Sequence, residues 1–207
     1  TGAAHGFDVT FADSNLELAV RTEINKPSGS IQNTDLVGVG FTSLRASSLN
    51  IQNLSGLEYC TDLTHVELYG NKISDISVLA SLTSLRDIYL WNNQIVDITP
   101  LTDLAQLKYV FLHNNLIQDI LPLFLNPGLG SGDIVNVSGN PIDQVGLCYI
   151  IPSLRASGVS VSHSGACGFI VVNIPDTNLE KKVRFVLSKP TGPIFDGDMA
   201  TIKTLTA

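Results

Sequence analysis

The sequence predicts an α/β solenoid: a right-handed superhelix of short parallel strands, with a 3₁₀ or extended return path on its convex side and a helical cap at its N-terminal end. Apolar residues recur at a fixed interval over most of the chain, as from Leu63 to Leu85 and Leu107, which indicates a repeat architecture. Every repeat contains a short alternation of apolar and polar residues, which is typical of a strand. A segment with helical periodicity precedes the first repeat, where a solenoid needs its open apolar end covered.

The cap is expected to span residues 1–40 and to contain a helix near residues 14–25. Apolar residues spaced by four give this segment one apolar helix face: Leu16, Val20 and Ile24. Ser14 and Glu17 have the spacing of a capping box, in which two side chains satisfy free N–H groups of the first turn. Pro27 cannot continue the helix, so we expect the helix to end shortly before that residue.

The repeat array is expected to cover residues 41–162. Its second unit displays the pattern: Leu63, Val66, Leu68, Asn71, Ile73, Ile76, Leu79 and Leu82. Val66 and Leu68 are two positions apart on a strand, so both face the core. Equivalent positions predict five parallel strands, centred on Leu44, Val66, Ile88, Val110 and Val135. The fifth unit follows an insertion near residues 128–132, and its inward positions are expected to be Val135, Val137, Ile142, Val145, Cys148, Ile151 and Leu154.

Two polar residues also recur at the same interval. An asparagine follows each strand from the second unit onward: Asn71, Asn93, Asn115 and Asn140. A buried amide at this turn can bond backbone groups of neighbouring units, so we expect these residues to form a ladder. An aspartate precedes the second isoleucine that follows the strand in three units: Asp75, Asp97 and Asp119. We expect these carboxylates to cap the convex turns.

The tail repeats the sequence of the cap. The segment that begins at Asp176 matches the segment that begins at Asp13, so that Leu179 and Val183 correspond to Leu16 and Val20. Thr177 and Glu180 again have the spacing of a capping box. We therefore expect residues 163–207 to contain a linker and the start of a second cap-like module, and the chain to be part of a longer modular protein. The alternative is a C-terminal cap that shares ancestry with the N-terminal cap.

The three cysteines do not form a C-x-x-C pair, which argues against a zinc site or a disulfide framework. Cys60 and Cys148 replace leucine at core-facing positions, so we expect both to behave as buried hydrophobic residues. Cys167 lies in a loop after the array. It either pairs with Cys148 or remains a free thiol.

The polar positions of each strand segment point away from the core, onto the concave face of the predicted sheet. Ten residues at these positions are the candidate ligand-binding site: Arg45, His65, Glu67, Tyr69, Asp87, Tyr89, Trp91, Tyr109, Phe111 and His113. Exposed aromatic surface usually marks an interaction site, and Trp and Tyr are typical interface anchors. The alternative is that the rings only pack on one another across the strands.

Composition excludes several classes of function. The chain carries 12 Lys and Arg against 19 Asp and Glu, a formal charge of −7, and has no cluster of basic residues for phosphates, so nucleic acid is not an expected partner. No apolar stretch approaches the roughly 20 residues that a membrane helix needs, so direct membrane insertion is not expected either. No set of residues has the pattern of a catalytic, metal or cofactor site, and we expect a non-enzymatic chain that is monomeric.

The unit L-x-x-L-x-L-x-x-N-x-I-x-D-I-x-x-L-x-x-L resembles the 22-residue leucine-rich repeats of bacterial internalin-like surface proteins, over about residues 36–162. The resemblance implies an exported or surface-displayed binding module with a protein receptor on another cell. The aromatic rings also leave a glycan ligand open. Eukaryotic phosphatase-regulatory repeat proteins share the repeat length, so the alternative is an intracellular scaffold or regulatory subunit.

Overall fold

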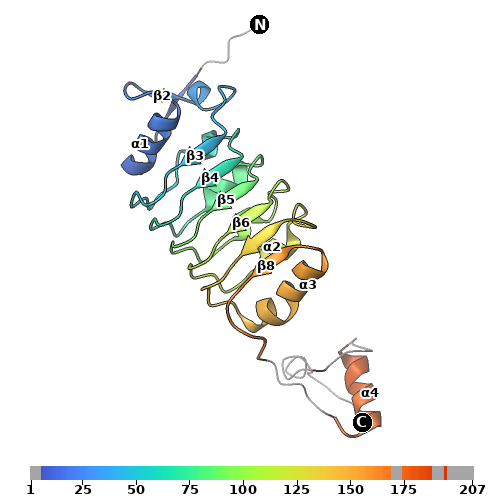
Figure 1. Cartoon of the computed structure of the whole chain (residues 1–207). Coiled ribbons are helices and arrows are strands. Elements are labelled where there is room, and N and C mark those ends of the chain that lie inside the picture. The colour runs from blue at the N-terminus through green and yellow to red at the C-terminus, as the bar shows by residue number, and fades with distance from the viewer. Residues whose placement is uncertain (1–5, 169–173, 188–193, 195–207) are drawn as a thin grey trace. The chain divides into compact units, whose positions relative to one another are not determined.

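The computed structural model describes residues 6–168, 174–187 and 194. The chain divides into two compact units, Thr1–Gly165 and Ala166–Ala207, which are described separately below. The first unit contains the cap and the whole repeat array (Figure 1). In the second unit the structure describes one helix, and the rest of the expected cap-like module lies largely outside the described residues.

The cap consists of helix α1 (Ser14–Glu23) and a two-stranded antiparallel ribbon, β1 (Asp8–Val9) with β2 (Ile31–Gln32), followed by the 3₁₀ turn η1 (Asn33–Asp35). The helix was predicted, and the ribbon was not. Leu16 and Val20 are fully buried. The predicted capping box is wrong: Asp13 precedes the helix and accepts the backbone N–H groups of Asn15 and Leu16. Glu17 instead forms an ion pair with Arg21 at 2.7 Å.

The array forms one parallel sheet in chain order, with the strands β3 (Ser43–Arg45), β4 (His65–Glu67), β5 (Asp87–Tyr89), β6 (Tyr109–Phe111), β7 (Ile134–Asn136) and β8 (Ser160–Ser162) (Figure 1). The first five are centred on the predicted residues, and the sixth was not predicted. From β3 to β6 the register pairs equivalent positions of consecutive units, as the repeat requires. Val66 and Leu68 are fully buried, which confirms the predicted phase of the strands.

The return path opposite the sheet is built of short turns, as predicted: η2 (Leu57–Tyr59), η3 (Ser77–Ser81), η4 (Thr99–Leu101) and the one-turn helix α2 (Leu121–Leu125). Each of the three recurring aspartates lies two residues before one of the last three of these turns. Asp75, Asp97 and Asp119 each accept the backbone N–H two positions further on, at 2.8, 2.8 and 2.7 Å. The expected caps of the convex turns are therefore present.

The asparagine ladder is also present. Asn93 donates to the carbonyl oxygens of Leu68 in the preceding unit and Leu90 in its own unit, both at 3.0 Å. Its own oxygen accepts the N–H of Ile73 at 3.0 Å. The equivalent bonds recur at Asn71, Asn115 and Asn140. Each amide thus joins two consecutive units and satisfies backbone groups that the turn would leave unpaired.

The fifth unit departs from the prediction because its return path is helical. A π-helix (η5, Gly146–Ile150) runs directly into α3 (Ile151–Ala156). On a helix the buried face repeats at intervals of three and four residues. Buried residues follow that spacing: Leu147, Ile150, Ile151 and Leu154. Val145 and Cys148, which were expected to face the core, are respectively exposed and half-buried.

The three cysteines differ in whether they form a disulfide bond. Cys60 is fully buried and is the free cysteine among the described residues. Burial, with a smaller contribution from the charge of Glu58, raises the pKa of its thiol to about 12. Cys148 and Cys167 are both disulfide-bonded, so Cys167 is not a free thiol.

The second unit contains α4 (Thr177–Val186), which repeats the local structure of α1. Asp176 accepts the N–H groups of the second and third helix residues at 2.8 and 2.9 Å, as Asp13 does in the cap. Glu180 and Arg184 form an ion pair at 2.7 Å, equivalent to the pair within α1. The predicted capping box at Thr177 is therefore wrong for the same reason as in the cap.

Candidate binding face

The expected concave face corresponds to the outward side of the β3–β8 sheet, which we call the sheet face. Strand register aligns its side chains in columns. Arg45, Glu67, Tyr89 and Phe111 are direct partners along one column. A second column consists of Ser43, His65, Asp87 and Tyr109. A third follows the strand ends and consists of Ser47, Tyr69, Trp91, His113 and Ser138.

Five rings from two of these columns form two stacks, which we call the aromatic stacks, with ring planes nearly parallel within each stack and nearly perpendicular between them. In the first, Trp91 lies between Tyr69, at a centroid distance of 4.0 Å and 4°, and His113, at 5.2 Å and 9°. In the second, Tyr89 lies on Phe111 at 5.1 Å and 7°. Tyr89 and Trp91 meet edge to face at 5.7 Å and 78°, which joins the stacks. Parallel strands about 4.8 Å apart impose this ring spacing.

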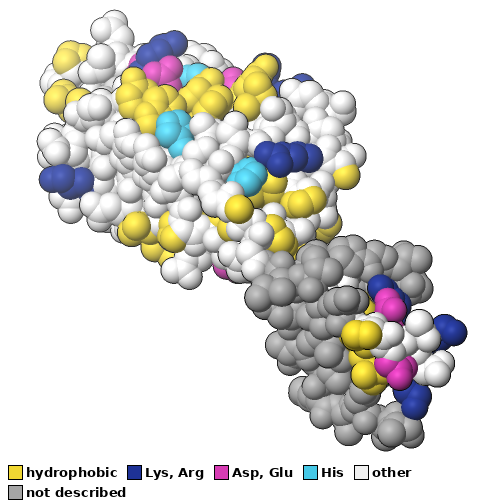
Figure 2. Space-filling model, turned by 60° about the horizontal axis from the view of Figure 1, so that its bottom comes forward, with side chains coloured by type: hydrophobic (Ala, Val, Ile, Leu, Met, Phe, Trp, Pro, Cys, Tyr) yellow, Lys and Arg dark blue, Asp and Glu magenta, His cyan; other side chains and the backbone are white. Residues whose placement is uncertain are grey.

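The stacking decides which parts of the rings are open to a ligand. Both faces of Trp91 are covered by neighbouring rings. All five rings are only half-buried, so the stacks offer their edges to solvent. Figure 2 shows hydrophobic side chains in a contiguous patch beside a histidine and charged side chains, toward the upper edge of the view. The rings therefore pack on one another across the strands, and this packing leaves a partly exposed apolar surface.

Charged groups adjoin the stacks on the side of the cap. Nε2 of His65 lies 3.0 Å from the carboxylate of Glu67, which accepts a hydrogen bond when that nitrogen carries a proton. Nδ1 of His65 lies 3.6 Å from Asp87, and Arg45 lies 3.8 Å from Glu67. The His65 ring also contacts Tyr89 at 5.1 Å. These residues link the charged margin to the rings, although partly exposed ion pairs of this kind each contribute at most about 1 kcal/mol to stability.

Burial in the stacks keeps two titratable rings uncharged. Burial, followed by the charges of Asp87 and Glu67 and by Tyr109, raises the pKa of Tyr89. Burial lowers the pKa of His113. At neutral pH the phenol of Tyr89 is therefore protonated and the imidazole of His113 is neutral. The centre of the sheet face thus carries no charge.

Several polar atoms on the sheet face are buried without a hydrogen-bond partner in the described part of the chain: Ser43 Oγ, Ser47 Oγ, His113 Nδ1 and Asp87 Oδ1, the last of which lies 3.4 Å from Nε of Arg86 in an ion pair. Buried polar groups in proteins almost always have a partner, either protein or water. All four belong to the columns of the candidate site. The sheet face therefore has unused hydrogen-bonding capacity beside its rings.

The structure places all ten predicted site residues on this one face, as the register requires. Nine are half-buried, and Arg45 is exposed. Sequence reasoning did not anticipate the ion pairs of Arg86 with Asp87 at 3.4 Å and of Arg45 with Glu23 of the cap at 3.9 Å. Both depend on side-chain conformations, for which the sequence pattern carries no signal.

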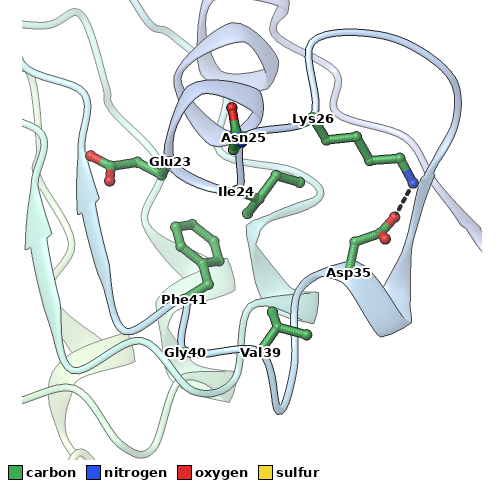
Figure 3. Close-up of a pocket in the computed structure, with 8 residues that line it drawn as sticks. All are labelled: Glu23, Ile24, Asn25, Lys26, Asp35, Val39, Gly40 and Phe41. Atoms are coloured by element: carbon green, nitrogen blue, oxygen red, sulfur yellow. Dashed lines mark hydrogen bonds and ion pairs between the residues drawn. The ribbon is translucent and has the colours of Figure 1, made fainter.

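The described residues offer little for other kinds of site. Within them, no group of His, Cys, Asp and Glu side chains is arranged to hold a metal ion, and no helix has the length and apolar character to cross a membrane. A cavity of about 270 Å³ lies in the cap (Figure 3). Its polar side is formed by Lys26 and Asp35, which pair at 2.6 Å, and Asp35 also accepts the N–H of Gln32. These charges are already satisfied, so the cavity has a structural explanation.

Comparison with known proteins identifies the fold. A family model described as leucine-rich repeats (2 copies) matches residues 83–125. An internalin (InlF) from Listeria monocytogenes is similar over 80% of this chain and 55% of its own, with 24% identity and a TM-score of 0.63. The functional domain of InlJ from the same organism is similar over 67% of this chain and 30% of its own, with 24% identity and a TM-score of 0.54. No curated protein matches the sequence significantly.

The fold is therefore the leucine-rich-repeat solenoid of the internalin type, and the resemblance stated from the sequence is confirmed at that level. The chain spans little more than half of the length of InlF and less than a third of InlJ.

Proposed function

We propose that this leucine-rich-repeat protein is a non-enzymatic binding module whose sheet face recognises a protein ligand. The observation that carries the proposal is the pair of aromatic stacks, which lie outside the core. The core is complete without them, because the inward residues of the same strands are fully buried: Val66, Leu68, Ile88, Leu90, Val110 and Leu112. Aromatic rings held rigidly on a surface are typical interface anchors, since they lose little conformational entropy on binding.

The proposed site comprises the ten candidate residues, in two roles. The stacked rings of Tyr69, Tyr89, Trp91, Phe111 and His113 form its apolar centre. The other five residues form a polar margin that sets specificity: Arg45, His65, Glu67, Asp87 and Tyr109. An apolar centre within a polar rim is the usual anatomy of a protein interface.

We also propose that the protein works outside the cytoplasm, as an exported or surface-displayed bacterial protein. Support comes from Cys148 and Cys167, which are disulfide-bonded. Structural disulfides persist in oxidising compartments and are rare in the cytosol, where thiols are kept reduced. The intracellular scaffold is the less supported alternative for this reason.

Site-specific photo-cross-linking tests the proposed function. A benzophenone amino acid replaces Ser160 or Ser162, which are exposed on β8 of the sheet face, and replaces Phe124 on the convex helix α2 as the control. Each variant is irradiated in the presence of proteins extracted from the surface of intact cells. We expect the same protein to be captured from both positions of the sheet face and not from Phe124. Capture from Phe124 alone would mean that the ligand binds on the convex side. Capture of a glycan without any protein would mean that the ligand is a glycan.

A further inference from the structure

The helix of the second unit has the local structure of the cap helix. Both α1 and α4 have ten residues, follow an aspartate that accepts the first backbone N–H groups, and contain the same Glu–Arg ion pair. The equivalent valines, Val20 and Val183, have 0% and 1% of their surface exposed. The equivalent isoleucines after the helices, Ile31 and Ile194, are both 2% exposed. The second unit therefore shares these buried positions with the N-terminal cap.

In the N-terminal cap, one side of the helix region is covered by the first repeat unit. Phe11 and Leu16 are 5% and 0% exposed, and both belong to one hydrophobic core with the repeat array. Between them in the sequence, Asp13 bonds the start of α1 with one oxygen. Its other oxygen accepts the N–H groups of Gln52 and Asn53 in the first return path, at 2.8 and 3.4 Å. We call the positions of Phe11, Asp13 and Leu16 the array side of the cap.

The array side of the second unit is uncovered. Ile174, which corresponds to Phe11, is half-buried, and Leu179, which corresponds to Leu16, is 42% exposed. One carboxylate oxygen of Asp176 accepts two N–H groups of α4, and among the described residues the other oxygen accepts no hydrogen bond. A single exposed leucine is ordinary on a protein surface. Here, however, all three positions of the array side lack the cover that their equivalents have.

Two substitutions distinguish the second unit from the first cap near this side. Ala12 donates its N–H to the carbonyl oxygen of Ser55 at 3.3 Å, and Pro175 at the equivalent position has no N–H to donate. Lys182 replaces Ala19, which is 6% exposed. A lysine can lay its apolar stem along a neighbouring surface and keep its ammonium group in water. The array side thus remains usable, with one backbone bond fewer.

We propose that the second unit is an N-terminal cap whose array side binds the first unit of a second leucine-rich-repeat array, supplied by the polypeptide that follows the cap. The first cap identifies this occupant, because it shows what covers an array side of this sequence: an apolar first unit whose return path offers backbone N–H groups to the aspartate. A solenoid buries its open apolar end against a cap, so each array in such a protein has a cap of its own.

Thiol labelling of a lengthened chain tests the proposal. Residues 41–168, which contain the array of this protein, are joined after Lys203, so that Phe41 follows the second cap as it follows Gly40 of the first. Leu179→Cys places a thiol on the array side of the second unit in the original and in the lengthened chain. We expect maleimide to label this thiol at least about a hundredfold more slowly in the lengthened chain, because a buried thiol reacts only when the structure opens.

The matched control is Lys181→Cys on the same helix. Lys181 is exposed, and its equivalent Leu18 remains 64% exposed although the first array is in place. The thiol of this variant should therefore react at the same rate in both chains. Circular dichroism establishes that the added array is folded. Equal labelling of Leu179→Cys in the original chain and in a lengthened chain with a folded second array overturns the proposal.

A pair of variants of the original chain tests the alternative, in which the second unit caps the C-terminal end of the first array. Leu16→Asp should lower the urea midpoint of the array, because it places a carboxylate where a side chain is fully buried. Leu179→Asp should leave that midpoint unchanged, because the array side of the second unit awaits another array. A lower midpoint for Leu179→Asp contradicts the proposal and favours the C-terminal cap.

An exchange of helices decides the matter if the added array does not fold. Residues 177–186 replace residues 14–23, so that the sequence of α4 takes the place of α1 against the existing array. We expect this chain to unfold at a higher urea concentration than the Leu16→Asp variant, since Leu179 then occupies the position of Leu16. A midpoint no higher than that of Leu16→Asp means that α4 cannot cap a repeat, and the proposal is wrong.

Discussion

Single side chains that bond across the turns hold consecutive units together. Asn93 illustrates the arrangement, because its one amide group bonds backbone groups of two units. Asn115 and Asn140 repeat it in the following units. The spacing of these asparagines in the sequence is enough to predict the ladder, because each one follows its strand at the turn where the backbones of neighbouring units lie close together.

Asn93→Ala should lower the free energy of unfolding by about 1–3 kcal/mol, because it leaves the N–H of Ile73 without a partner and removes one of the two amide donors from each of two carbonyl groups. The control is Gln94→Ala, which removes an exposed amide at the next position. Equal losses in urea unfolding for the two variants contradict the ladder.

Cys60 should resist thiol reagents in the folded protein, because its side chain is fully buried and burial raises its pKa to about 12. The measurement is labelling with a maleimide, without reductant, before and after denaturation. We expect no label in the native protein and one label per chain after denaturation, since Cys148 and Cys167 are disulfide-bonded. Rapid labelling of Cys60 in the native protein means that its assignment to a core-facing position of the repeat is wrong. Three labels per chain after denaturation mean that the disulfide is absent.

At the scale of elements, Asp13 couples the cap helix to the first repeat. One carboxylate oxygen accepts the N–H groups of Asn15 and Leu16 at the start of α1, at 2.9 and 3.3 Å. The other oxygen accepts those of Gln52 and Asn53 in the first return path, at 2.8 and 3.4 Å. Burial alone would raise the pKa of Asp13, but these four bonds outweigh it and the pKa is lowered.

Asp13→Ala should therefore destabilise the protein in a pH-dependent way. A carboxylate whose pKa is lowered by folding contributes stability above its unfolded pKa, and this contribution is lost as the pH falls through the folded pKa. We expect a loss of about 1–2 kcal/mol at pH 7, in the range of a lost N-cap, that shrinks below the ordinary value of 3.8. The check is urea unfolding of parent and variant from pH 7 to pH 3, with the exposed Asp103→Ala as control. A difference that is constant with pH contradicts this role.

The elements differ in how far the sequence predicts them. The strands from β3 to β7 were predicted at their centres, because each lies between fixed positions of a strict repeat. The helices η5 and α3 were missed, since apolar residues at spacing three also suit the extended path of the other units. β8 was missed because the unit that contains it has no asparagine after its strand. The capping residue of α1 was misplaced by one position because Asp13 and Ser14 are both good N-caps.

For the molecule as a whole, one strand register creates both the core and the candidate site. The inward residues of each strand complete the core, and the outward residues align into columns across the sheet. The membership of the face was predictable because side chains alternate strictly along a strand. The conformations that stack Tyr69, Trp91 and His113 were not predictable, since they depend on contacts between columns.

The central claim is that the aromatic stacks bind the protein ligand, and the most direct measurement is the affinity of Trp91→Ala for the partner captured by cross-linking. Trp91 contacts a ring on each side, so its truncation should weaken the site as a whole. We expect the dissociation constant to rise at least about thirtyfold, which corresponds to about 2 kcal/mol.

The matched control in this measurement is Phe124→Ala, which removes an exposed ring from the convex helix α2 and should leave the dissociation constant unchanged. Circular dichroism establishes that both variants are folded, because Trp91→Ala also loses stacking contacts within the protein. A thirtyfold loss confined to Trp91→Ala is the predicted result. A folded Trp91→Ala that binds the partner as tightly as the parent contradicts the account.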